Sequence, residues 1–149
     1  MKQHLVQDWM SSPPITIDID ATLPEACELI RKHQIRRLPV LQDGKLAGIV
    51  TRGDLRGAQP SEATTLSIWE LNYLLAKLKI KTIMTPEPIT IREDATISEA
   101  AQIMIDYKVS GLPVVNAAGD LVGMITESDI FRMVVKNWRE EKQHAPDPA

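Results

Sequence analysis

Two Thr-x-x-Asp pairs are the residues whose types and spacing could do chemistry. Thr51 stands three residues before Asp54, and Thr126 stands three residues before Asp129, each pair following a short apolar segment. At a strand-to-helix turn, such a hydroxyl and carboxylate can cap the helix that follows. The carboxylate can also accept hydrogen bonds from two vicinal hydroxyls, as on a ribose, with the threonine hydroxyl beside it. The sequence leaves both roles open.

Both pairs belong to an internal repeat. Residues 6–55 align with residues 80–130 at an offset of 74, which becomes 75 after one inserted residue, Ala117 or Ala118. Each copy predicts an extended segment such as Ile15–Ile17, a helix, two apolar strands around a turn, and a second helix. Capping boxes at Thr22 and Thr96, each with a glutamate three residues later, mark the first helix of each copy.

We therefore expect an α/β (α+β) protein of two β-α-β-β-α repeats. A copy of about 55 residues buries little apolar surface by itself, so the two should pack together with pseudo-twofold symmetry. The predicted boundaries are 1–57 for the first repeat, 58–79 for a linker, 80–138 for the second repeat and 139–149 for a disordered tail. In the linker, residues 58–65 resemble a loop, and Ser67-x-x-Glu70 predicts the start of a helix.

The first Thr-x-x-Asp pair has arginines around it. Arg36, Arg37 and Arg52 could bind phosphate oxygens as bidentate forks, or could simply be solvated surface cations. The matching positions in the second copy are Ser110, Gly111 and Glu127. The two sites are therefore not equivalent, and the first is better suited to phosphates.

Composition argues against several other classes of function. With 17 basic and 20 acidic residues the net charge is −3, and six residues are aromatic, so nothing favours nucleic acid. No apolar run approaches the roughly 20 residues of a membrane span. Cys27 is the single cysteine, which fits a reducing cytoplasm, and its place on an apolar helix side favours an inert thiol over a nucleophile. No catalytic triad, phosphate loop or metal motif is present, so an enzyme is the least favoured class.

The repeat resembles a tandem pair of cystathionine-β-synthase (CBS) domains, often called a Bateman module. The resemblance rests on the motifs Ile35–Val40 and Gly48–Leu55, which return as Val109–Val114 and Gly123–Ile130. The linker segment Trp69–Leu75 is also similar to that of acetoin-utilisation-type CBS proteins.

This resemblance implies a non-catalytic regulatory module that binds an adenosyl ligand and signals by a change in conformation or assembly. In CBS domains the aspartate of the Thr-x-x-Asp pair binds ribose, and main-chain groups near the early strands contact the purine. The first site implied here comprises Thr16, Ile35, Arg36, Arg37, Thr51, Arg52 and Asp54. The second comprises Thr90, Val109, Ser110, Gly111, Thr126 and Asp129.

The expected ligands are AMP, ADP or ATP, with S-adenosylmethionine or NAD as alternatives, and no metal or other cofactor is required. The rival interpretation is an interaction or scaffold module that binds no nucleotide. We also expect a homodimer, because the segment Ile130–Trp138 has apolar residues on more than one helical face and CBS modules tend to pair through such helices. The linker helix and tail could instead cover that surface within one chain. An effector protein would be a further partner.

Overall fold

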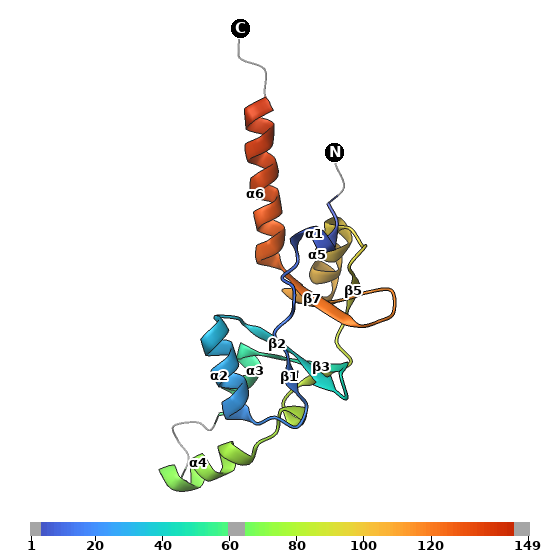
Figure 1. Ribbon diagram of the computed structural model, residues 1–149. Coiled ribbons are helices and arrows are strands. Elements are labelled where there is room, and N and C mark those ends of the chain that lie inside the picture. The colour runs from blue at the N-terminus through green and yellow to red at the C-terminus, as the bar shows by residue number, and fades with distance from the viewer. Residues whose placement is uncertain (1–3, 60–64, 145–149) are drawn as a thin grey trace. The chain divides into compact units, whose positions relative to one another are not determined.

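The computed structural model describes residues 4–59 and 65–144, which form two compact units (Figure 1). One unit is built from residues 14–88, and the other combines the chain before residue 14 with the chain after residue 88. The units therefore do not coincide with the sequence repeats. The residues that lead into each repeat belong to the unit built around the other repeat.

The unit of residues 14–88 contains one four-stranded sheet with the order β1-β2-β3-β4. Strand β1 is parallel to β2, and the other pairs are antiparallel. Its core gathers the apolar faces of the strands and of the first long helix, with Leu38, Val40 and Val50 fully buried. The elements are β1 (Ile17–Asp18), α2 (Leu23–His33), β2 (Arg37–Gln42), β3 (Lys45–Thr51), α3 (Arg52–Gly57), α4 (Ile68–Lys77), the 3-10 helix η1 (Ile80–Thr82) and β4 (Thr85–Pro86).

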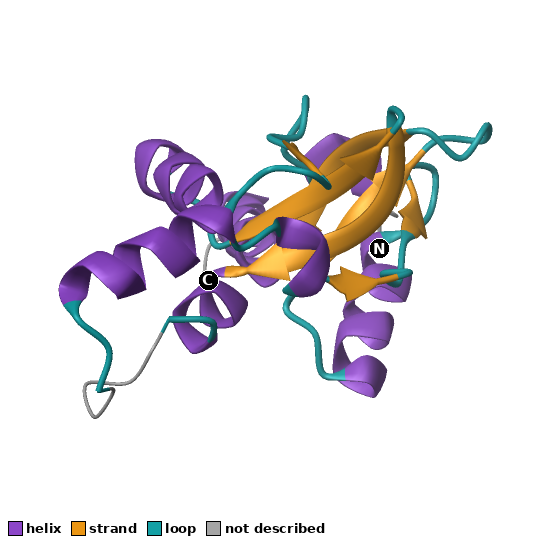
Figure 2. Ribbon diagram, turned by 90° about the horizontal axis from the view of Figure 1, so that it is seen from below, coloured by secondary structure: helices purple, strands orange, loops and turns teal. Residues whose placement is uncertain are grey.

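The second unit repeats this plan with a three-stranded sheet of order β5-β6-β7. Its buried core includes Leu112, Val114 and Ile125, which match Leu38, Val40 and Val50 of the first unit. The elements are α1 (Val6–Trp9), β5 (Ile91–Arg92), α5 (Ile97–Tyr107), β6 (Gly111–Val115), β7 (Leu121–Thr126) and α6 (Glu127–His144). Figure 2 shows the helices and strands of both units by colour.

The predicted β-α-β-β-α order is confirmed in both units, and local chemistry explains it. Thr96 accepts a hydrogen bond from the Glu99 amide at 3.1 Å, and Glu99 accepts one from the Thr96 amide at 3.2 Å, which is the capping box predicted for α5. At the β2–β3 turn, Asp43 and Gly44 both have positive φ, as a two-residue type I′ turn requires.

Three boundaries differ from those expected. The first strands are only two residues long, because β1 and β5 each pair with one neighbour over two positions. Helix α6 continues to His144, past Trp138, since residues 139–143 are strong helix formers with no glycine or proline among them. Residues 60–64 of the predicted loop and 145–149 of the predicted tail lie outside the described residues.

Helix α4 begins as predicted, with the Ser67 hydroxyl accepting from the Glu70 amide at 3.2 Å.

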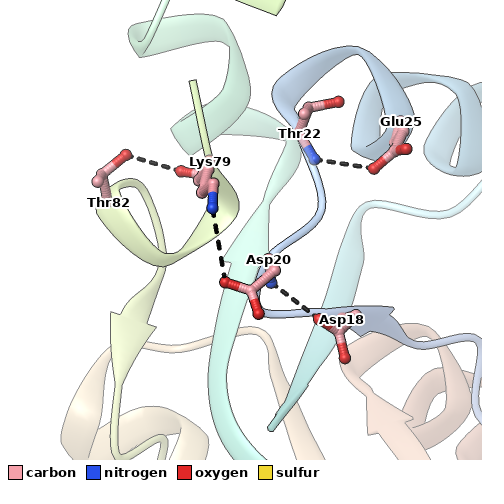
Figure 3. Close-up of polar contacts among 6 residues, drawn as sticks. All are labelled: Asp18, Asp20, Thr22, Glu25, Lys79 and Thr82. Carbon is pink, nitrogen blue, oxygen red and sulfur yellow. Dashed lines mark hydrogen bonds and ion pairs between the residues drawn. The ribbon is translucent and has the colours of Figure 1, made fainter. Parts of the chain in front are cut away.

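The residues that lead into the second repeat are held against the β1–α2 turn of the first unit (Figure 3). The Leu23 amide donates to the Leu78 carbonyl at 2.9 Å, and the Ile80 amide donates to the Ala21 carbonyl at 2.8 Å. An exposed ion pair joins Lys79 to Asp20. In the other unit the Ile97 amide donates to the His4 carbonyl at 2.8 Å, so the arrangement is repeated.

Gly48 on β3 and Gly123 on β7 permit close backbone approaches by residues 84–85 and 10–11. A Cβ on Gly48 would lie 2.8 Å from the Thr85 carbonyl oxygen and 2.5 Å from the Met84 sulfur. A Cβ on Gly123 would lie 2.8 Å from the Ser11 carbonyl oxygen and 2.7 Å from a methionine sulfur in the same way. The backbone oxygen cannot move aside as a flexible side chain could. Glycine at these two matching positions is therefore required by the packing of residues 84–85 and 10–11.

We expect Gly48→Ala to lower the free energy of unfolding by about 1–3 kcal/mol, because the added methyl overpacks a buried site. The matched control is Gly57→Ala, where a Cβ would meet nothing within 4 Å. Urea unfolding followed by circular dichroism measures both. Equal stability of the two variants would contradict the close approach at Gly48.

Candidate functional site

In the unit of residues 14–88, the predicted site residues gather at one end of the sheet. The register pairs Arg37 with Thr51 at the end of the β2–β3 ladder. Just beyond this pair, the amide of Arg52, which follows Thr51, donates to the carbonyl of Arg36, which precedes Arg37, at 2.8 Å. This hydrogen bond closes the strand end where α3 begins. Arg36, which directly precedes β2, therefore lies beside the first turn of α3.

Thr51 and Asp54 cap helix α3, which is one of the two roles, capping and ribose binding, that the sequence left open. The Asp54 amide donates to the Thr51 hydroxyl oxygen at 3.1 Å, and the Thr51 amide donates to Asp54 Oδ2 at 2.8 Å. Among the described residues, no group donates a hydrogen bond to Asp54 Oδ1. The carboxylate is half-buried. The helix cap therefore fixes the carboxylate through Oδ2 alone.

Thr16 and Ile35 precede two neighbouring parallel strands, β1 and β2. Thr16 is half-buried and directly precedes β1, whose first residue, Ile17, pairs with Val40. Ile35 packs against the apolar core. Its amide donates to the Ile30 carbonyl at 3.2 Å, and the matching Val109 amide donates to Met104 at 3.1 Å. These amide hydrogen bonds end the preceding helices, α2 and α5.

The second unit has the same backbone plan around Thr126 and Asp129. Gly111 pairs with Thr126 in the sheet, and the Glu127 amide donates to the Ser110 carbonyl at 3.0 Å. Val109 packs against the core of this unit, and Thr90 is exposed just before β5. The structure therefore brings residues 109–111 together with 126–129, as the sequence implied.

The side-chain contacts of Asp129 differ from those of Asp54. Asp129 Oδ2 accepts from the Thr126 amide at 2.9 Å and from the Thr126 hydroxyl at 3.1 Å. Its Oδ1 forms a short ion pair with Arg132, and the residue is only 3% exposed. Both oxygens of this carboxylate therefore have partners within the chain.

Arg132 was not among the residues that the sequence singled out. Its spacing, three residues after Asp129 on the same helix, is a signal that could have identified it, because residues at i and i+3 are neighbours on a helix surface. The position three residues after Asp54 is Gly57, which has no side chain to reach back. The structure thus adds a second difference between the sites, beside the arginines of the first.

Three other features bear on chemistry. Burial raises the pKa of the half-buried Cys27 thiol, which disfavours the nucleophilic thiolate. Within residues 4–59 and 65–144, no group of three or more His, Cys, Asp or Glu side chains could hold a metal ion. None of the helices in the described part of the chain is both long enough and apolar enough to span a membrane.

Comparison with known proteins agrees with this geometry. The family model of the CBS domain matches residues 6–61 and 80–136. A CBS domain-containing protein of Dictyostelium discoideum is 38% identical over 133 residues, which cover 89% of this chain and 92% of that protein. The chain belongs to the CBS domain family, and it carries the domain twice.

Solved CBS pairs have the same fold. The CBS domain pair of protein MJ0100, in complex with 5'-methylthioadenosine and S-adenosyl-L-methionine, is 34% identical with a TM-score of 0.75, covering 91% of this chain and 99% of that one. CBSX2 in complex with AMP is 28% identical with a TM-score of 0.75, covering 89% and 97%. A putative acetoin utilisation protein of Vibrio cholerae is 29% identical with a TM-score of 0.77, covering 97% and 100%, in line with the resemblance of the linker.

Proposed function

We propose that this chain is a non-catalytic regulatory module that binds an adenosyl ligand and signals by a change in conformation or assembly. The observation that carries the proposal is the Asp54 carboxylate, which is fixed by the helix cap through one oxygen and has the other available. The relatives crystallised with AMP or with 5'-methylthioadenosine and S-adenosyl-L-methionine support an adenosine-bearing ligand.

Ribose binding is assigned first to the unit of residues 14–88. A carboxylate can accept hydrogen bonds from both ribose hydroxyls, and these bonds are stronger than those between neutral groups. Asp54 has the free oxygen that this needs, whereas Arg132 competes for the corresponding oxygen of Asp129. We therefore propose that the first site binds more tightly than the second.

Phosphate binding is assigned to the same unit. Arg36 and Arg52 are exposed and adjacent through their backbones, and Arg37 is half-buried at the start of β2. Guanidinium groups bind phosphate oxygens bidentately, while Glu127 at the matching position of the second repeat repels them. AMP, ADP or ATP should accordingly bind the first site more tightly than adenosine. Main-chain groups would contact the adenine base in the same way in AMP, ADP, ATP, S-adenosylmethionine and NAD, so all of these remain proposed ligands.

The rival proposal is an interaction or scaffold module without a bound nucleotide. It is favoured by exposed apolar side chains on α4, among them Trp69 and Tyr73. A thermal-shift panel of AMP, ATP, S-adenosylmethionine and NAD separates the two. A ligand at 100 times its Kd adds about 2.7 kcal/mol of stability, whereas a scaffold module would show no shift with any of them.

We propose that two copies of the chain pair through α6, which would give the module a way to signal by assembly. Phe131, Val135 and Trp138 are spaced by four and three residues, so they share one helical face, and Phe131 and Trp138 are 62% and 66% exposed. Light scattering should give twice the chain mass of 16.6 kDa. A monomer at micromolar concentration, with and without AMP, would exclude this pairing. An effector protein remains a further proposed partner.

The proposed hydrogen bonds between Asp54 and the ribose are tested by removing first the carboxylate and then the ribose hydroxyls. We expect Asp54→Asn to weaken AMP binding by about 1.5–3 kcal/mol in calorimetry, because a hydrogen bond to a charged acceptor is lost. Asparagine keeps an oxygen that can accept from the Thr51 amide, so the helix cap and the fold should survive. The matched control is Asp43→Asn in the exposed β2–β3 turn, which should bind as the parent does.

The second half of this test uses 2',3'-dideoxy-AMP, which lacks the hydroxyls. The parent should bind it more weakly than AMP, and Asp54→Asn should bind the two alike, because the coupling energy of the cycle isolates the carboxylate–ribose contact. Equal losses for the analogue in parent and variant would refute the ribose role of Asp54.

The proposed competition at Asp129 predicts a gain of binding. In Arg132→Ala the Oδ1 oxygen loses its partner, so a second AMP should bind at concentrations where the parent binds one. Calorimetric stoichiometry measures this, and Arg139→Ala, an exposed arginine on the same helix, is the control. An unchanged stoichiometry and affinity in Arg132→Ala would show that the ion pair does not restrict the second site.

A further inference from the structure

We propose that the unit of residues 14–88 contains a binding site for a polyvalent oxyanion such as inorganic triphosphate. The site is a cavity of about 570 Å³ between α2, α3 and the start of β2. Four arginines line it, Arg31, Arg36, Arg52 and Arg56, together with the apolar residues Ile30 and Leu55. We call it the arginine pocket. Helices α2 and α3 pack against each other, so both of its walls belong to one unit.

Three of the four arginines in the arginine pocket have no ion pair among the described residues. None of its lining residues is an Asp or Glu. Among the described residues, no acceptor pairs with the guanidinium groups of Arg36, Arg52 or Arg56, and Arg31 has a single ion pair, with exposed Glu28 at 2.7 Å. Like charges brought together around one cavity repel one another, and an anion bound between them would relieve that repulsion.

The internal repeat shows that the fold does not require these arginines. The positions that match Arg31 and Arg56 in the second repeat carry Ile105 and Phe131. The positions that match Arg36 and Arg52 carry Ser110 and Glu127. The same helix pair and sheet thus form without any of the four cations, and their convergence is particular to the first unit.

Favourable placement at helix ends explains only part of this pattern. Arg31 and Arg56 lie in the last turns of α2 and α3, where a cation is stabilised by the helix dipole. That effect acts on each helix separately. It does not account for Arg36 before β2 and Arg52 at the start of α3, or for all four side chains lining one cavity.

The arrangement favours an anion with several charges on adjacent oxygens. Guanidinium forks bind phosphate oxygens bidentately, and four of them around one cavity match a chain of phosphates better than a single phosphate. Neither Thr51 nor Asp54 lines the arginine pocket, so no ribose is needed for binding there. The anion could be free polyphosphate or the phosphate chain of a nucleotide. Ile35, Arg36 and Arg52 belong to both the arginine pocket and the proposed adenosyl site, so the inference rests in part on the proposed function and extends its phosphate contacts to Arg31 and Arg56.

The test titrates sodium triphosphate into the full chain by calorimetry at 50 mM salt. We expect the double variant Arg31→Gln/Arg56→Gln to bind triphosphate at least about 10-fold more weakly than the parent. Its matched control is Arg139→Gln/Lys142→Gln on α6, which removes the same charge from exposed positions and should stay within about twofold of the parent. Thermal melts should show both variants folded, because all four side chains are exposed.

Adenosine and ATP complete the test. The pocket variant should bind adenosine as the parent does. ATP that displaces triphosphate identifies a nucleotide phosphate chain as a source of the anion, and ATP that does not displace it identifies free polyphosphate. Absence of triphosphate binding, an equal loss in the α6 control, or a parallel loss of adenosine binding in the pocket variant would each overturn the proposal.

Discussion

The hydrogen-bonded end of the β2–β3 ladder is the constraint on which the first site depends. Arg37 pairs with Thr51, and the next residues are joined by the 2.8 Å bond from the Arg52 amide to the Arg36 carbonyl. Thr51 therefore ends a strand and caps a helix at once. Because the cap uses the Thr51 amide and hydroxyl to fix Asp54, structural capping and ligand binding are compatible roles of one carboxylate.

The same turn in the second repeat shows how small changes alter it. Its backbone bonds are conserved in kind, with the Glu127 amide donating to the Ser110 carbonyl. Arg132 then forms an ion pair with Asp129 Oδ1, and Glu127 stands where the first repeat has Arg52. One copy thus has arginines and a carboxylate oxygen without a donor at this turn, and the other has a glutamate and a carboxylate paired with Arg132.

Much of the fold was predictable from local pattern, because caps, turns and apolar spacing act over a few residues. The hairpin at Asp43-Gly44 and the α5 capping box are of this kind. Contacts between segments distant in sequence were not predictable. Glycine at positions 48 and 123 repeats in the sequence, but only the structure shows Met84 and Met10 packed there. Likewise Arg36 and Arg52 were expected together, while Arg31 and Arg56 join them only because α2 packs on α3.

A crystal structure of the chain with AMP tests the central claim most directly. We expect the ribose hydroxyls within hydrogen-bonding distance of Asp54 Oδ1 and the phosphate beside Arg36, Arg37 or Arg52, with the Asp129–Arg132 pair intact in any molecule whose second site is empty. AMP bound without contact to Asp54, or bound only at Asp129, would contradict the assignment of the adenosyl site to residues 14–88.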